Sequence, residues 1–395
     1  MRQVVPTRAE IRGDFSVTGA TIMDPLTRQP FPGNQIPASR IDQVGAAIAG
    51  LYPEPNISGA GTRRINFQKN RSITSTPDVT VTRIDHAFSS NDKIFGRLLT
   101  NLNTPEEGPV YPQPGVDDGH FRQDNHYYSV SGTWFHTFTP VAMMELRYSW
   151  DQRKFHNMSG GLDLGLADKV GLKGTGSRYF PRVNVTGFPS LGRGEHERLQ
   201  FPIIGHHMSG SLTQVRGRHT LKFGADFRRS QNTDIPNGNA GGTFGFNTTA
   251  TGDALAALLL GHVASASRAE VLEVVSNAAT IGLYGQTDWK VHPRLTLNLG
   301  LRWDLDWPRW EANNRQNSFD QTAINPVCNC PGLITWSGRN GLSRYAHNFD
   351  KNNFGPRAGF AWNPAEKWVI RGGAAMVYIG AYDLATPIRF NIGFS

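Results

Sequence analysis

The stretch Leu295–Trp307 alternates strictly between apolar and polar positions. Every odd-numbered residue in it is Leu or Trp, and every even-numbered residue is polar or Gly. This period of two predicts a β-strand with one apolar and one polar face. At about 3.4 Å per residue the 13 residues extend about 44 Å, and a tilt of about 45° leaves about 31 Å, close to the thickness of a hydrocarbon core. The pattern therefore predicts a strand that is long enough to cross a membrane.

The segment just upstream shows the same alternation. Its apolar face carries Ile281, Leu283, Gly285, Thr287, Trp289 and Val291, and its polar face carries Thr280, Tyr284, Gln286, Asp288 and Lys290. Only residues 291–294 separate the two runs, which predicts a β-hairpin with a short turn. Trp289, Trp303 and Trp307 near the strand ends are typical of an aromatic belt at a membrane surface.

The pattern of strand, short turn and strand recurs along the chain. The predicted hairpins cover about 79–99, 129–153, 208–228, 280–307 and 354–378. The alternation is weaker in the first and the last of these hairpins. Five hairpins predict about ten strands.

The segments that join the hairpins are long and differ in composition. Residues 101–125, 154–207, 230–279 and 310–353 are rich in Gly, Asn and Pro. Loops of this length are uncommon inside compact soluble domains. Short turns at one end of the strands and long loops at the other are typical of outer-membrane barrels. The predicted fold is thus all-β: part of an antiparallel transmembrane β-barrel, about ten strands of a larger one, with short periplasmic turns and long extracellular loops.

Two short helices are expected inside the loops. Val44, Ile48 and Leu51 have helical spacing, which predicts a helix over about 40–51 that packs on the barrel rim. Asp253 precedes the apolar run 254–260 and has the character of an N-cap. We accordingly divide the chain into a first large extracellular loop region, 1–78, and a partial barrel domain, 79–395.

Composition and charge narrow the function classes. Only 38% of residues are hydrophobic, and the longest apolar run falls far short of the about 20 residues that a spanning helix needs. The net charge is +8, but the 40 basic residues are spread over strands, turns and loops, whereas a nucleic-acid binder usually clusters them. We expect no nucleic-acid partner; the charge is better suited to phosphorylated lipid head groups or an anionic solute.

Motifs for catalysis or metal binding are weak. Cys328 and Cys330 alone make an incomplete zinc site, and they are expected either to pair or to stay reduced. The run Glu195–Gln200 begins like a zinc-protease helix, but Gln200 stands where the second His would be required. His206 and His207 lack a neighbouring carboxylate or Cys and are expected to open a strand that begins near Met208. We therefore predict no catalytic, metal or cofactor-binding residues and no enzyme activity.

Several runs of residues carry a resemblance to a known family. Tyr284–Trp303 resembles a barrel hairpin of TonB-dependent outer-membrane transporters. More narrowly, the chain resembles the Oar-like barrel group. The matching runs are Gly13–Phe15, Asp24–Thr27, Pro30–Pro37, Arg40–Asp42, Tyr52–Asn56, Arg216–Gly224 and Phe354–Pro364. The resemblance covers nearly the whole chain, but its motifs describe the barrel and not the cargo.

The resemblance implies energised uptake of a large solute across the outer membrane. In that family a ligand binds the loops and a plug, and TonB pulls on the plug. This chain differs from the family plan, because Met1–Thr7 has no apolar signal-peptide core and neither a plug nor a TonB box is found. About half of the family's 22 strands are predicted. We therefore expect a fragment of the barrel, in contact with outer-membrane lipid and coupled to TonB only through a plug that this chain lacks.

Two alternatives remain open at this point. The first is a passive porin or an adhesion-type outer-membrane barrel, which would need no plug. The second is a soluble all-β carbohydrate-binding or hydrolytic protein, because Trp and Tyr stack on sugars and long Gly-rich loops are common in such proteins. No pattern identifies the ligand, which stays unknown.

Overall fold

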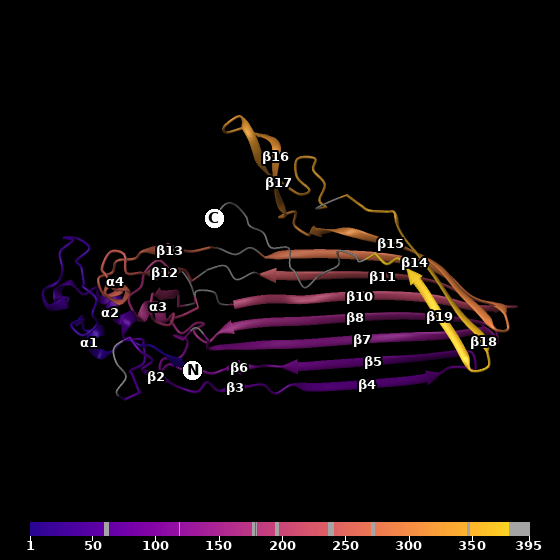
Figure 1. Cartoon of the computed structure of the whole chain (residues 1–395), viewed down its shortest axis with the longest axis horizontal. Helices are drawn as coiled ribbons and strands as arrows, with labels where there is room; N and C mark the ends of the chain where they lie inside the picture. Colours follow the sequence, from indigo (N-terminus) through magenta and orange to yellow (C-terminus); the bar gives the residue numbers. More distant parts are fainter. Residues whose placement is uncertain are drawn as a thin grey trace.

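The structure is a computed structural model, and it describes residues 1–58, 63–117, 119–175, 178, 180–193, 197–235, 241–269, 273–345 and 348–378. Most of the chain belongs to one large antiparallel sheet, with small helices gathered at one end of its strands (Figure 1). No helix in these ranges is long and apolar enough to cross a membrane.

Ten strands form the continuous path of this sheet, and each pairs with its neighbour along the chain. They are β4 (Asp78–Ala87), β5 (Asp92–Asn103), β7 (Phe121–Thr139), β8 (Ala142–Ser159), β10 (Glu197–Arg216), β11 (His219–Ile235), β14 (Val274–His292), β15 (Leu295–Glu311), β18 (Asn353–Ala365) and β19 (Trp368–Ala375). Two short strands, β3 (Ile73–Thr74) and β6 (Glu106–Glu107), extend one end. The predicted five hairpins and ten strands of an antiparallel barrel sheet are confirmed.

The strands are much longer than their alternation predicts. The hairpin predicted at 129–153 spans 121–159, the one at 208–228 spans 197–235, and the one at 280–307 spans 274–311. The predicted loops 154–207, 230–279 and 310–353 were therefore too long, because their end residues belong to the strands. The reason lies on the apolar face: beyond Trp150 the outward positions of β8 become Gln152 and Lys154, so the period-two signal disappears although the backbone stays extended.

Two prolines hid the true strand limits as well. Pro202 lies in β10 where the register shifts between Gln200 and Ile203, and Pro308 lies in β15 opposite a shift between Asn277 and Ala279. Such irregularities accept a residue that cannot donate to the ladder. His206 and His207 consequently lie inside β10, and the expectation that they open the strand is wrong.

The short turns all lie at the other end of the sheet, away from the helices (Figure 1). Each of the first four turns also hydrogen-bonds to the next hairpin. Backbone N–H groups of Thr137, Val215, Lys290 and Asn363 donate to the carbonyls of Asn91, Val141, Arg218 and Arg294, respectively, at 2.8–2.9 Å. The ladder thus continues through the turns, which holds neighbouring turns in a fixed relation.

The long loops and the N-terminal region fold together into what we call the loop domain, made of residues 1–58, 63–72, 108–117, 160–175, 180–193 and 241–269. It contains α1 (Arg8–Ile11), α2 (Gln43–Ala49), α3 (Leu166–Lys169), α4 (Ala254–Leu259) and the 3-10 turns Pro32–Asn34 and Ala38–Arg40. Its strands are β1 (Arg2–Gln3) paired with β2 (Phe67–Gln68), and β9 (Arg182–Val185), β12 (Thr243–Phe246) and β13 (Ser265–Ser267) in a small sheet.

One buried apolar core unites the loop domain. Its largest fully buried side chains include Phe15, Ile22, Tyr111, Leu191, Leu255 and Leu258, so every long segment from the N-terminal region to β13 contributes. The core lies beyond the ends of the strands, and the sheet itself has an exposed apolar face. This separation follows from the membrane, which takes the place of a protein core beside the sheet.

Helix α4 forms the centre of this core. Asp253 caps it as predicted, accepting hydrogen bonds from the backbone N–H groups of Leu255 and Ala256 at 2.9 and 3.2 Å. All six of its residues are buried, as expected of a helix that is apolar all round. Helix α2, within the predicted 40–51, packs on α4 and not on the barrel rim. A Cβ at Gly45 would lie 2.1 Å from the Leu258 carbonyl oxygen, so only Gly permits this close approach.

The segment between β15 and β18, predicted as a loop, holds a further hairpin. It consists of β16 (Asn317–Asn325) and β17 (Cys330–Trp336), which projects away from the large sheet (Figure 1). A disulfide joins Cys328 to Cys330 at its tip.

The loop-domain core yields a test with two substitutions of the same type. Leu258→Ala removes a side chain that is 1% exposed and should destabilise the loop domain by about 2–5 kcal/mol, whereas Leu26→Ala, at a residue 79% exposed, should change its stability by less than about 0.5 kcal/mol. The urea dependence of trypsin cleavage within residues 1–58 measures both. Equal cleavage profiles for the two variants would contradict a shared core.

Candidate functional site

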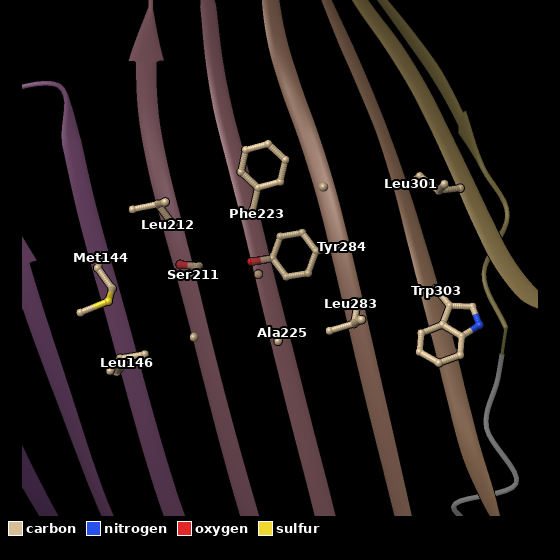
Figure 2. Close-up of a pocket in the computed structure, with 13 residues that line it drawn as sticks. Met144, Leu146, Ser211, Leu212, Phe223, Ala225, Leu283, Tyr284, Leu301 and Trp303 are labelled. Atoms are coloured by element: carbon tan, nitrogen blue, oxygen red, sulfur yellow. The ribbon is translucent and has the colours of Figure 1, made fainter. Parts of the chain in front are cut away.

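The large sheet presents two chemically different faces. Alternation places Leu212, Phe223, Leu283 and Leu301 on one face, where each is between 39% and 51% exposed. A shallow groove of about 680 Å³ crosses this apolar face from β8 to β15 (Figure 2). Apolar side chains left uncovered by protein over five strands are suited to contact with lipid.

Small residues form the floor of the groove. A Cβ at Gly210 would lie 2.8 Å from Leu146, and one at Gly285 would lie 3.2 Å from the ring of Phe223. The large side chains thus lie across the glycines of the neighbouring strands. Figure 2 shows Leu146, Phe223 and Leu283 around this hollow.

The opposite face is polar and carries a network of charges. Arg302 on β15 donates to Asp304 on the same strand and reaches Asp226 on β11, with N–O distances of 2.7 and 2.8 Å. To do so it crosses β14 above Gly282, where a Cβ would lie 1.9 Å from a guanidinium nitrogen of Arg302. Gly282 therefore lets one side chain join three strands.

The network borders a cavity of about 210 Å³. Its charged lining residues are Asp226, Arg228, Arg302, Asp304, Asp306 and Arg357. The lining combines three carboxylates with three guanidinium groups, so it presents both signs of charge to the interior. Such a surface suits hydrogen bonding with water and polar solutes and does not suit lipid.

Buried ion pairs connect the segments of the loop domain. Arg63 contacts Glu10 in α1 at 3.1 Å and Asp253 at the start of α4 at 2.6 Å, and it lies 4.3 Å above the ring of Phe188. Arg71 similarly contacts Asp117 at 2.7 Å, and the Asp117 carboxylate also accepts from the backbone N–H of Val110. The loops are thereby held as one body.

Two further groups in the loop domain show the effect of these surroundings on protonation. A two-pronged hydrogen bond from Arg40, at 2.7 and 2.9 Å, lowers the pKa of Asp24 to about 2. Burial raises the pKa of Tyr52, whose hydroxyl donates to the Pro189 carbonyl oxygen at 2.7 Å. Both interactions are structural. The hydrogen bonds from Arg40 keep Asp24 charged, and burial keeps Tyr52 neutral.

The residues considered for chemistry in the sequence are not brought together. His206 lies on the apolar side, where its Nδ1 is 2.9 Å from the Tyr148 hydroxyl, while alternation turns His207 to the polar side. Residues 194–196, which include the start of the protease-like run, lie outside the described residues. Cys328 and Cys330 pair with each other, which resolves the open choice in favour of a disulfide. No cluster of potential metal ligands occurs among the described residues.

Sequence reasoning found the polar-face carboxylates but missed their partners. Asp304 was assigned to the polar face by alternation, and the strand register now explains how Arg302 reaches Asp226 across β14. A glycine opposite two Asp residues on the neighbouring strands is the signal that could have indicated this crossing. The ion pairs of the loop domain join residues up to 190 positions apart and leave no local signal.

The chain matches one family model and is similar to several solved structures. A family model described as an outer membrane beta barrel domain matches residues 1–395. Among solved structures, the chain is similar to the copper transporter OprC, with 9% identity and a TM-score of 0.43 over 76% of this chain and 36% of that one. It is also similar to the ferripyoverdine receptor of the outer membrane of Pseudomonas aeruginosa, with 11% identity and a TM-score of 0.44 over 76% and 35%.

A third similar structure is the ferric-catecholate import receptor Fiu of E. coli K12, with 11% identity and a TM-score of 0.41 over 77% of this chain and 43% of that one. This chain therefore spans between about a third and two fifths of the length of these structures. No curated protein matches the sequence.

Removal of the guanidinium that bridges three strands should weaken the sheet. Arg302→Gln leaves Asp226 and Asp304 without their shared partner and should lower the free energy of unfolding by about 1–3 kcal/mol. Arg371→Gln, an exposed position on the same face but outside this cavity, serves as the control and should have little effect. Urea unfolding in detergent, followed by tryptophan fluorescence, compares the two; equal midpoints would contradict the bridging role.

The Asp24–Arg40 pair predicts a pH dependence of the loop domain. Because the folded-state pKa of Asp24 is about 2, below the about 3.9 of an unfolded chain, its stabilising effect is complete above pH 4 and is lost as the pH falls towards 2. Asp24→Asn should remove this part of the acid sensitivity. The measurement is the pH at which residues 1–58 become cleavable by pepsin, and an unchanged acid midpoint in the variant would argue against the pair.

Proposed function

The chain belongs to the outer membrane β-barrel domain family, and from this premise we propose that it is part of the barrel and loops of a TonB-dependent transporter that takes up a large solute. The proposal rests on one observation. The sheet has one face suited to lipid and one charged face, and a packed loop domain lies at the end of its strands. The chain lies in the outer membrane with its short turns towards the periplasm.

The open edges of the sheet favour a larger barrel. Among the described residues, β4 and β19 do not pair with each other and each leaves one edge free. In lipid every unpaired backbone group costs several kcal/mol, so both edges need partner strands. A barrel of more than ten strands, as in the Oar-like group that the sequence resembles, would supply them.

The loop domain supports the receptor part of the proposal. We infer that residues 1–78 act with the later long loops as one extracellular unit above the barrel strands of 79–395. Its shared core and buried ion pairs would hold solute-binding loops in a preformed arrangement, which lowers the cost of ordering them on binding. We predict no enzyme activity, and coupling to TonB would pass through a plug that contacts the charged face.

The transporter and the passive porin differ in energy dependence. Host cells that express the complete proposed transporter, with this chain as part of its barrel and with its plug, are supplied with radiolabelled ferric siderophores, cobalamin, oligosaccharides and oligopeptides, with and without a functional TonB. We expect one of these solutes to accumulate only when TonB is present. Liposomes that contain the protein should not swell in an isosmotic small sugar; rapid swelling, or accumulation that is equal without TonB, would favour a porin instead.

A further inference from the structure

Three arginines lie at two neighbouring short turns, at the end of the sheet opposite the loop domain. Arg216, Arg218 and Arg294, which we call the basic turn cluster, are all exposed. The backbone N–H of Lys290 donates to the Arg218 carbonyl oxygen at 2.8 Å, and the Arg218 guanidinium donates to the Val291 carbonyl oxygen at 3.2 Å. The two turns, and therefore the charges, are fixed beside each other.

These charges have no counterpart in the described protein. None of the three forms an ion pair with a described residue. The nearby carboxylate of Asp288 lies on the polar face, which it shares with Lys290, and Glu366 on the next turn is followed directly by Lys367. The cluster therefore presents uncompensated positive charge to whatever lies at this end of the barrel.

The cluster adjoins the apolar face at the level expected of the membrane surface. The ring of His219 stacks on Trp289 with centroids 5.3 Å apart and an interplanar angle of 15°. Arg216 pairs with His219 in the strand register and so shares the outward face with this aromatic pair. Leu212, which lines the groove in Figure 2, lies four residues before Arg216 in β10, at a distance of about 14 Å along the strand.

We propose that the basic turn cluster binds the phosphate of an anionic phospholipid in the leaflet that faces the short turns, with the acyl chains against the groove. Guanidinium groups suit phosphate oxygens, and basic side chains next to a membrane attract anionic lipids. A free anion would use the charges but not the adjoining apolar face. A lipid uses both, which is why we assign the site to a phospholipid.

The test measures lipid retention and needs no transported solute, so its outcome is independent of the proposed transport. The full chain is purified in a non-ionic detergent and mixed with equal amounts of phosphatidylglycerol and phosphatidylcholine, and native mass spectrometry counts the lipid that stays bound. Phosphatidylglycerol should be preferred. The variant with Arg216→Gln, Arg218→Gln and Arg294→Gln should lose this preference, by roughly five-fold for each charge removed.

A matched control removes the same charge at the other end of the molecule. Arg28→Gln, Arg64→Gln and Lys69→Gln change three exposed positions of the loop domain and should leave the preference unchanged. If the triple turn variant does not fold, as judged by its β-sheet circular dichroism, Arg218→Gln alone should still give the roughly five-fold loss.

Three results would overturn the proposal. They are equal retention of the two lipids by the unmodified chain, an unchanged preference in the folded turn variant, and the same loss in the loop-domain control. A fourth arm adds inorganic phosphate: displacement of the lipid at millimolar concentration would identify a site for free anions and reject the phospholipid.

Discussion

The requirement that no backbone polar group remain unpaired in lipid governs this molecule. Between the two edge strands β4 and β19, the large sheet meets it by pairing each strand with its chain neighbour, and the turns extend the ladder with hydrogen bonds of their own. Since the backbone bonds are satisfied within the sheet, the side chains are free to differ on the two faces. The apolar face is left for the membrane, and the other face carries ion pairs such as Arg302 with Asp226.

The part of the fold that obeys a local period could be predicted from the sequence. Leu295–Trp307 alternates because its odd side chains lie on the apolar face of the sheet, and the hairpins built on this rule were placed correctly, although their ends were not. Beyond Trp150 the outward positions of β8 are polar, and β10 and β15 carry prolines at irregular positions, so these strand ends have the composition of loops. Extended backbone outside the hydrocarbon leaves no periodic signature.

The loop domain was beyond sequence reasoning for a different reason. Its core joins residues from Val5 to Leu259, and its ion pairs join Arg63 to Asp253 and Arg71 to Asp117. Only α2 and α4 had local signals, in the helical spacing of Val44 and Ile48 and in the continuous apolar run after Asp253, and both helices were predicted. The candidate site was predictable only in part for the same reason. Alternation assigned Asp304 to the polar face, but the contact of Arg302 with Asp226 across β14 depends on strand register.

The shared core of the loop domain also limits how the sequence of these loops can change during evolution. Surface loops of barrels ordinarily tolerate insertion and exchange one at a time, because each contacts little else. Here a change in the segment that holds α4 alters the neighbours of α1, α2 and β9 together. The hairpin of β16 and β17 contacts none of them to a comparable extent. Sequence variation under pressure from phages or antibodies should therefore concentrate in residues 317–336, while the remaining loops change only in concert.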